Sequence, residues 1–222
     1  MKILIITLHA DPTIAPGAQE GGGTHMYINE LINLMIYKQV DSLFITRKAS
    51  KGKAFFEYGS VKLKRIEIGP EAPWNKNNLD EREDEISTAI NKELILQGFI
   101  PDLIHSVYWH SGRAALRFSK LFHIPFIHTI ISNGIRKRDT GYSISNQRIE
   151  IEKEIFAAAK VLISISNSEK ADLVSYYAIP EDKIRVIGRG VDNLFLKDIY
   201  DESGTLLSKQ SPIINSIPDA TK

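Results

Sequence analysis

The sequence predicts an α/β fold built on a doubly wound parallel sheet. Residues 2–8 form an apolar, isoleucine-rich run that is typical of a central strand covered on both faces. Short apolar runs then alternate with longer segments of helical periodicity along most of the 222 residues. Polar side chains follow the ends of several of these runs, which is where parallel sheets bind ligands.

The first strand leads through an irregular stretch into a glycine-rich turn and an amphipathic helix. Gly21, Gly22 and Gly23 stand directly before Thr24, which we expect to cap a helix whose apolar residues recur as far as Met35. A glycine turn at a helix N-terminus exposes backbone N–H groups to an anion or a sugar hydroxyl. Many such turns only make room for packing, but this one predicts a ligand site near the start of the chain.

Common nucleotide-binding and nucleophile motifs do not match this sequence. The glycine turn lacks the GxGxxG spacing, and the strand expected at 43–46 is followed by Arg47 rather than by the acidic residue that an NAD site needs. There is no Walker phosphate loop, no GxSxG elbow and no cysteine. An unrelated nicotinamide-dependent oxidoreductase is therefore the least favoured alternative.

The rest of the chain continues the alternation of strands and helices. We expect the strand at 61–68 to lie at a sheet edge, because it alternates apolar and basic residues. Residues 1–192 are expected to form one domain, and residues 193–222 a polar tail. Further strands are expected at 43–46, 102–106, 125–129, 161–165 and 184–187. Helices are expected at 79–96, 111–122, 144–159 and 168–177, and loops at 47–59, 69–78 and 131–143.

Composition argues against several classes of partner. The formal net charge is +1, so the chain has no electrostatic excess with which to bind nucleic acid. It has no cysteine, no signal peptide and no apolar run approaching ~20 residues, which predicts a cytoplasmic protein without disulfides or membrane spans. Membrane association through the basic and aromatic stretch 47–65 is an alternative that we do not favour, since a solvated loop is expected there.

The carboxyl ends of the expected strands carry polar side chains that a parallel sheet would bring to one crevice. A single histidine at such a place is more often structural, and Arg148 with Glu152 at i, i+4 is usually a surface pair worth ~0.5 kcal/mol. No histidine pair has the HxxxH spacing with an acidic partner, so we expect no metal site. The converging residues are His9, His25, Tyr108, Trp109, His110, His128, Thr129, Arg136 and Lys137.

Five segments follow one another in a characteristic order: GGGTHMYINEL, PDLIHSVYWHSG, IPFIHTIISNGIRK, QRIEIEKEIFAAAKVLISISNSEK and IPEDKIRVIGRGVD. Together they resemble the N-terminal half of retaining glycosyltransferases of family 4, over nearly all of residues 1–192. The resemblance is nearest to the sucrose synthase, sucrose-phosphate synthase and mycothiol-pathway group. It implies half of a GT-B fold, in which two Rossmann-like domains face each other across a cleft. The first domain holds the acceptor and the second the nucleotide sugar.

The resemblance also implies roles for residues of the cleft. Gly22 and Gly23 match the loop that lies beneath the donor phosphates and the acceptor. His25 stands where the mycothiol-pathway enzymes carry an asparagine, so its contact with acceptor hydroxyls is in question. His128, at a strand end, is the candidate catalytic residue, which we expect to position the acceptor or the donor hexose.

A second group of positions grips the acceptor phosphate in those relatives whose acceptor is phosphorylated. Lys137 matches the lysine of the loop that follows the "HT" segment, but the second histidine of that loop is Ile131 here. That departure weakens any assignment of the acceptor. The phosphate-gripping positions correspond to Lys76, Tyr108, Thr129 and Arg148.

The chemistry implied is transfer of a hexosyl group from a nucleotide diphosphate sugar to an acceptor hydroxyl, such as that of a phosphorylated sugar or cyclitol, with retention of configuration. Neither a metal nor another cofactor is expected, because helix dipoles and basic side chains stabilise the leaving diphosphate. A non-catalytic sugar-phosphate-binding or partner-binding domain of the same ancestry is the alternative. The residues after Asp192 are too few for a second Rossmann-like domain. We therefore expect an inactive isolated chain that pairs with a donor-domain chain or a second copy.

Overall fold

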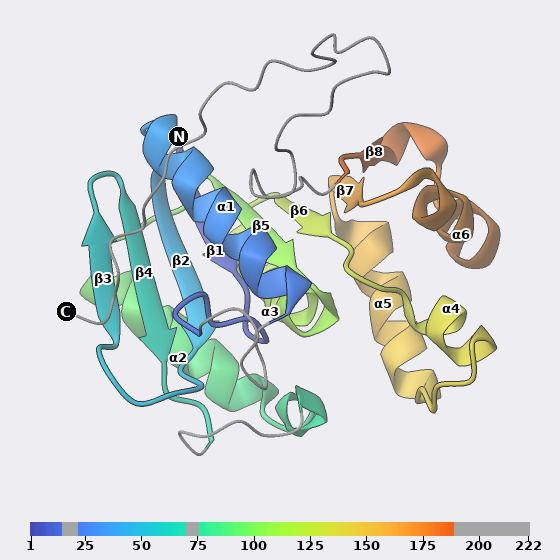
Figure 1. The fold of residues 1–222 in the computed structure, drawn as a ribbon, viewed down its shortest axis with the longest axis horizontal. Coiled ribbons are helices and arrows are strands. Elements are labelled where there is room, and N and C mark those ends of the chain that lie inside the picture. Colours follow the sequence, from blue (N-terminus) through green and yellow to red (C-terminus); the bar gives the residue numbers. More distant parts are fainter. Residues whose placement is uncertain (15–21, 70–75, 189–222) are drawn as a thin grey trace, which may run out of the picture. The chain divides into compact units, whose positions relative to one another are not determined.

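The first strand is the centre of the sheet. The computed structural model describes residues 1–14, 22–69 and 76–188, and within them eight strands form one sheet in the order β3-β4-β2-β1-β5-β6-β7-β8 (Figure 1). β1 (Lys2–Ile6) lies between β2 (Asp41–Arg47) and β5 (Leu103–Val107) and runs parallel to both. The predicted central parallel strand and the α/β fold class are therefore confirmed.

The remaining strands extend the sheet on either side of these three. All neighbouring strands are parallel except β3, which is antiparallel to β4. The strands are β3 (Phe55–Tyr58), β4 (Val61–Ile66), β6 (Phe126–Thr129), β7 (Val161–Ser164) and β8 (Ile184–Val186). The α-helices are α1 (Gly23–Tyr37), α2 (Glu83–Leu96), α3 (Trp109–Phe122), α4 (Gly134–Asp139), α5 (Asn146–Ala158) and α6 (Asn167–Tyr177). Two short 3₁₀ helices are η1 (Lys76–Leu79) and η2 (Glu181–Lys183).

Helices cover both faces of the sheet, as the double winding requires. Ile3 and Ile5 of β1 pack on the side of α1, together with Ile28 of that helix. Leu4 and Ile6 point to the opposite face, into the larger cluster that contains the apolar residues of α2 and α3. Because both sets are buried, the continuous apolar run of β1 matches its central position. Among the described residues no helix is long and apolar enough to cross a membrane.

The prediction that residues 61–68 form an edge strand is wrong. β4 pairs on one side with β2 and on the other with β3, a strand formed by residues that were expected to lie in a loop. The alternation in β4 has another cause. Val61 and Leu63 are buried under α1, while Lys62 and Lys64 point to a half-solvated face on which Lys64 pairs with Glu93 at 3.1 Å.

The basic and aromatic stretch 47–65 is likewise not one solvated loop, because it contains β3 and most of β4, and only residues 48–54 connect β2 with β3. Its last residue, Arg65, is 2% exposed, and its Nε donates to Asp11 Oδ2 at 2.8 Å. The guanidinium also donates to the carbonyl oxygens of Lys53 and Ser50, at 2.8 Å each. This buried ion pair connects Asp11, in the segment that follows β1, with Arg65 of β4. The sequence did not predict it.

Side-chain caps begin α4, α5 and α6, whereas α1, α2 and α3 begin without one. Thr24 does not cap α1, because Gly22 occupies the N-cap position with an extended backbone. α4 lies inside the expected loop 131–143 and begins after Asn133, whose side chain accepts from the Arg136 N–H at 2.7 Å. The sheet and helices belong to one unit, Met1–Ile187. The predicted boundary at 192 and the tail 193–222 lie outside the described residues.

Candidate functional site

The carboxyl ends of β1, β5 and β6 meet at one edge of the sheet. The Leu8 N–H donates to Ser111 Oγ at 3.0 Å, which ties the end of β1 to the first turn of α3. The Tyr108 N–H donates to the Thr129 carbonyl at 3.1 Å, which ties the end of β5 to the end of β6. Tyr108 and Thr129, predicted to converge, therefore lie side by side at this edge.

Tyr108 has an unusual backbone. It is the N-cap of α3 with φ 69° and ψ 155°, a region that is essentially restricted to glycine. Its carbonyl accepts the Gly112 N–H at 2.9 Å, and its ring lies 4.3 Å from the His9 ring, centroid to centroid. Such conformations cost about 1–3 kcal/mol and tend to occur at functional sites. The strain favours a functional role for this strand end.

Arg148 and Glu152 form a buried ion pair, not the surface pair expected from their spacing. Arg148 Nε donates to Glu152 Oε1 at 2.9 Å, and the two side chains are 8% and 0% exposed. Arg148 Nη1 donates to the Tyr108 hydroxyl at 3.5 Å, and Nη2 to the Ser132 carbonyl at 3.3 Å. The guanidinium carbon also lies 5.5 Å from the centroids of the Tyr108 and Trp109 rings. Because the pair is desolvated, the value for a surface pair does not apply to it.

Glu152 holds three elements together. Its Oε2 accepts from the Gly134 N–H at 2.7 Å and from the Tyr177 hydroxyl at 2.6 Å, in addition to the Arg148 contact on Oε1. Burial, and then the nearby Glu152 carboxylate, raise the pKa of Tyr177, so the phenol stays protonated and its O–H donates a hydrogen bond to that carboxylate. The sequence marked Glu152 only as the partner of Arg148, because Gly134 and Tyr177 come from distant parts of the chain.

Thr129 is fully buried beneath α1, where its hydroxyl has two polar neighbours. His105 Nε2 lies 2.8 Å from Thr129 Oγ1, and the Tyr27 hydroxyl lies 3.3 Å from the same atom. Burial lowers the pKa of His105 to about 4, so this ring is neutral near pH 7. His105 and Tyr27 therefore fix the Thr129 side chain, and sequence reasoning selected neither of them.

The position of His128 does not favour the predicted contact with substrate. Its side chain is buried, its Nδ1 lies 2.8 Å from Ser106 Oγ, and a Cβ at Gly112 would come within 2.8 Å of its Cε1. Burial, and then the neighbouring His105, lower the pKa of His128 to about 3. Side chains alternate along a strand, so His128 shares the core-facing side of β6 with Phe126. The catalytic role of His128 stays a prediction, and in this structure its ring packs in the core under α3.

The glycine turn and His25 lie at the start of α1. Gly22 and Gly23 are exposed, while His25 is buried and its Nδ1 accepts the Gly22 N–H at 3.3 Å. A Cβ at Gly22 would meet nothing within 4 Å, and its φ of −114° does not require glycine. Packing among the described residues therefore does not explain the glycine at this position.

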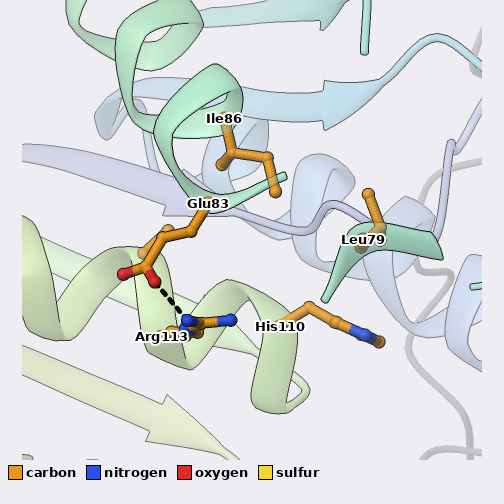
Figure 2. Close-up of a pocket in the computed structure, with 6 residues that line it drawn as sticks. Leu79, Glu83, Ile86, His110 and Arg113 are labelled. Atoms are coloured by element: carbon orange, nitrogen blue, oxygen red, sulfur yellow. Dashed lines mark ion pairs between the residues drawn. The ribbon is translucent and has the colours of Figure 1, made fainter. Parts of the chain in front are cut away.

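The two predicted lysines lie on other elements. Lys137 is half-buried on α4, and its Nζ lies 5.5 Å from the centroid of the Tyr142 ring. Lys76 is the first residue of η1, and its side chain lies outside the described part of the chain. The backbone of η1 leads directly into the region that Figure 2 shows, between α2 and the start of α3.

A small cavity and an apolar groove are lined by described residues. The cavity of Figure 2 has a volume of about 10 Å³, about one water, and is lined by Leu79, Glu83, Ile86, His110, Arg113 and Ala114. An apolar groove of about 410 Å³ lies instead at the amino ends of β5 and β6, between the last turns of α2 and α3. No group of three or more metal-ligating side chains comes together among the residues described.

Comparisons with known proteins identify the family. The model of Glycosyltransferase Family 4 matches residues 21–193. The D-inositol 3-phosphate glycosyltransferase of Pseudarthrobacter chlorophenolicus is 30% identical over 198 residues, which are 86% of this chain and 47% of that protein. The enzyme of the same name from Corynebacterium efficiens is 27% identical over 199 residues, 86% of this chain and 47% of its own length.

Solved structures agree on the fold. Sucrose-phosphate synthase from Thermosynechococcus elongatus superposes with a TM-score of 0.78 at 24% identity, covering 86% of this chain and 48% of that one. Anabaena HepE in complex with UDP and glucose superposes with a TM-score of 0.57 at 15% identity, covering 88% and 46%. These likenesses confirm half of a GT-B fold, and the chain spans about half the length of the curated relatives it matches. Since the family model matches well over half of its residues, the chain belongs to Glycosyltransferase Family 4.

Proposed function

We propose that this chain forms the acceptor side of a retaining glycosyltransferase. The reaction breaks the bond between the anomeric carbon of a nucleotide diphosphate sugar and its diphosphate, which leaves with the bonding electrons. An acceptor hydroxyl forms the new bond with configuration retained and releases its proton. The observation that carries the proposal is the meeting of Tyr108, Thr129 and Arg148 at one sheet edge, in a chain of this family.

An anionic acceptor, such as a phosphorylated cyclitol, fits the chemistry of Arg148. The guanidinium carries five N–H donors in a fixed fork, and the bond from Nε to Glu152 orients that fork. The terminal nitrogens make longer contacts of 3.5 Å and 3.3 Å, which a phosphate could replace with shorter, charge-assisted bonds. The relatives named above are D-inositol 3-phosphate glycosyltransferases, which supports this class of acceptor.

The start of α1 is the proposed approach for the donor. Gly22 and Gly23 are exposed at a helix N-terminus, where the helix dipole favours negative charge and small residues allow close approach. The HepE structures hold UDP, UDP-glucose, or UDP with glucose. In this proposal helix dipoles and basic side chains, rather than a metal, stabilise the leaving diphosphate.

Calorimetry of the 222-residue chain tests the acceptor proposal. We expect D-inositol 3-phosphate to bind at least about tenfold more tightly than inositol, because one charge-assisted contact is worth about 1.5–3 kcal/mol. Arg148→Lys keeps a charge opposite Glu152 but loses the fork, and should remove most of that preference. Arg117→Gln is the control, since Arg117 pairs with the exposed Asp84. Equal affinity for the two ligands would refute an anionic acceptor.

Mass spectrometry of mixtures with nucleotide sugars and acceptors distinguishes transfer from binding alone. A product whose mass is raised by one hexose supports the enzymatic role directly. If the chain alone binds the phosphorylated acceptor but forms no product, the result favours the alternative, in which this chain is a non-catalytic sugar-phosphate-binding domain. Adding a separately produced C-terminal half of a relative then tests whether a donor domain supplied in trans restores transfer.

A further inference from the structure

The buried pair of Arg148 and Glu152 uses only one oxygen of the carboxylate. Arg148 Nε donates to Glu152 Oε1 at 2.9 Å. The two terminal nitrogens donate elsewhere, to the Tyr108 hydroxyl at 3.5 Å and to the Ser132 carbonyl at 3.3 Å. Arginine and a carboxylate frequently form a bidentate pair with two parallel bonds. The single bond found here therefore depends on what occupies the second oxygen, Oε2.

Two donors from other helices occupy Glu152 Oε2. The Gly134 N–H donates to it at 2.7 Å and the Tyr177 hydroxyl at 2.6 Å. A carboxylate has about two lone-pair sites on each oxygen, so these two bonds use the capacity of Oε2. The phenol stays protonated near neutral pH, because burial, and then the Glu152 carboxylate, raise its pKa. Tyr177 is therefore a constant donor to this oxygen.

The Tyr177 side chain is fixed at both its ring and its hydroxyl. The oxygen accepts the Ile135 N–H at 3.2 Å, and the ring packs edge-on against Phe156 with centroids 4.9 Å apart. At Gly134 an added Cβ would lie 2.9 Å from Glu152 Oε2, so glycine allows this backbone to approach the carboxylate. The surroundings of Oε2 are therefore set by α4 and α6, not by the helix that carries the ion pair.

We propose that Tyr177 is a positioning residue that keeps the terminal nitrogens of Arg148 available to the acceptor. Its hydroxyl, together with the Gly134 N–H, fills Oε2 and limits Glu152 to one bond with the guanidinium. The two terminal nitrogens then remain on the side of Tyr108, where the proposed acceptor site lies. Tyr177 does not touch the acceptor itself, and its role rests on the proposed function.

Calorimetry of Tyr177→Phe in the 222-residue chain tests this role. The preference for D-inositol 3-phosphate over inositol should fall about fivefold, because the vacated Oε2 can draw a terminal nitrogen of Arg148 into a bidentate pair. Affinity for inositol should change less than about twofold, which a general loss of structure would not allow. Tyr176→Phe is the matched control, since Tyr176 is the neighbouring residue and is 39% exposed.

A double-mutant cycle and a rescue show whether the effect passes through the guanidinium. In an Arg148→Lys background, Tyr177→Phe should change the preference less than about twofold, because lysine has no fork to position. Replacing Tyr177 with 4-aminophenylalanine keeps an N–H donor on the same ring and should restore most of the preference. Additive effects of Tyr177→Phe and Arg148→Lys would contradict the positioning role.

A crystal structure of the Tyr177→Phe chain tests the geometry without any ligand. Glu152 Oε2 should lie within hydrogen-bond distance of a terminal nitrogen of Arg148, and Tyr176→Phe should keep the single bond. An unchanged pair, an equal loss of affinity for both ligands, or a Tyr177→Phe chain that does not fold would overturn the role of Tyr177. Equal affinity of the wild type for the two ligands would instead defeat the proposed function, and the role in acceptor binding with it, even where the crystal structure shows the bidentate pair.

Discussion

The Arg148 Nε and the Glu152 Oε1 lie 2.9 Å apart in a place where water reaches almost none of either side chain. The other oxygen of Glu152 accepts from Gly134 and Tyr177. One carboxylate thus connects α5, α4 and α6, and it also orients the guanidinium that faces Tyr108. The pair is part of the structural core and part of the proposed acceptor site at once.

Replacing Glu152 with Gln should strongly destabilise the chain. The amide cannot balance the Arg148 charge, and breaking a buried pair by removing one partner costs about 3–5 kcal/mol. The unfolding free energy from urea titration measures this loss. Glu150→Gln on the same helix is the matched control, because Glu150 and Lys153 form an exposed pair and should change stability by less than about 0.5 kcal/mol. Equal losses in the two variants would contradict a buried, stabilising role for Glu152.

Gly112→Ala should also destabilise the chain, although alanine normally favours a helix. The added Cβ would lie 2.8 Å from His128 Cε1 and 3.0 Å from Ile155 Cδ1, so the neighbours must shift. Overpacking of this kind costs about 1–3 kcal/mol, against a propensity gain of about 1 kcal/mol. Thermal unfolding of Gly112→Ala with and without Ile155→Val tests the contact. Removing Cδ1 should recover part of the loss, and a Gly112→Ala variant more stable than the wild type would exclude the clash.

Local patterns in the sequence predicted the elements well, and tertiary contacts account for what they did not predict. The apolar run at Lys2–Ile6 can only be stable inside a covered sheet, so the central strand followed from composition. β3 is four residues long and depends on pairing with β4, which no local pattern reports. Within residues 131–143, which were expected to form a loop, Asn133 is a typical N-cap residue and indicated the start of α4.

The meeting of the strand ends was predictable from the sequence, and the contacts of the individual residues there were less so. Convergence at the carboxyl edge follows from the parallel sheet, which is why Tyr108 and Thr129 meet as expected. An i, i+4 spacing cannot say whether Arg148 and Glu152 are buried, because their environment comes from other elements. His128 was selected because it lies at the end of a strand. It is two residues from the buried Phe126, so the alternation of side chains along β6 places it on the core-facing side.

Acid should destabilise the fold through His105 and His128. Their pKa values are about 4 and about 3 when folded, below the ordinary 6.5, because burial disfavours the charged rings. Between pH 6.5 and 4 the unfolded chain therefore binds protons at these residues that the native chain does not. The unfolding free energy is highest above pH 6.5 and falls with decreasing pH, by about 1.4 kcal/mol per pH unit for each histidine.

Urea unfolding at pH 7, 6 and 5 measures that slope. His128→Asn should reduce the slope of the unfolding free energy against pH by the contribution of one histidine, about 1.4 kcal/mol per pH unit. This should hold even if the variant is less stable at every pH. Leu121→Asn is the control, because this exposed residue does not titrate and should leave the slope unchanged. A wild-type stability that does not change between pH 7 and 5 would show that the two rings are not held neutral in the native state.

The strained backbone of Tyr108 predicts an inverted preference between glycine and alanine. At φ 69° and ψ 155° a Cβ is disfavoured, so Tyr108→Gly should be more stable than Tyr108→Ala by about 1–2 kcal/mol, although both variants lose the ring. At the exposed Arg117 of the same helix the order should be the usual one, with Ala about 1 kcal/mol more stable than Gly. At each position the glycine and alanine variants lose the same side-chain contacts, and both positions belong to one helix. An opposite order of stability at Tyr108 and Arg117 is therefore due to the backbone conformation of Tyr108. Chemical denaturation of the four variants measures both differences. If Tyr108→Ala were the more stable of its pair, the strand end would not be strained, and the link drawn from its conformation to a functional role would fail.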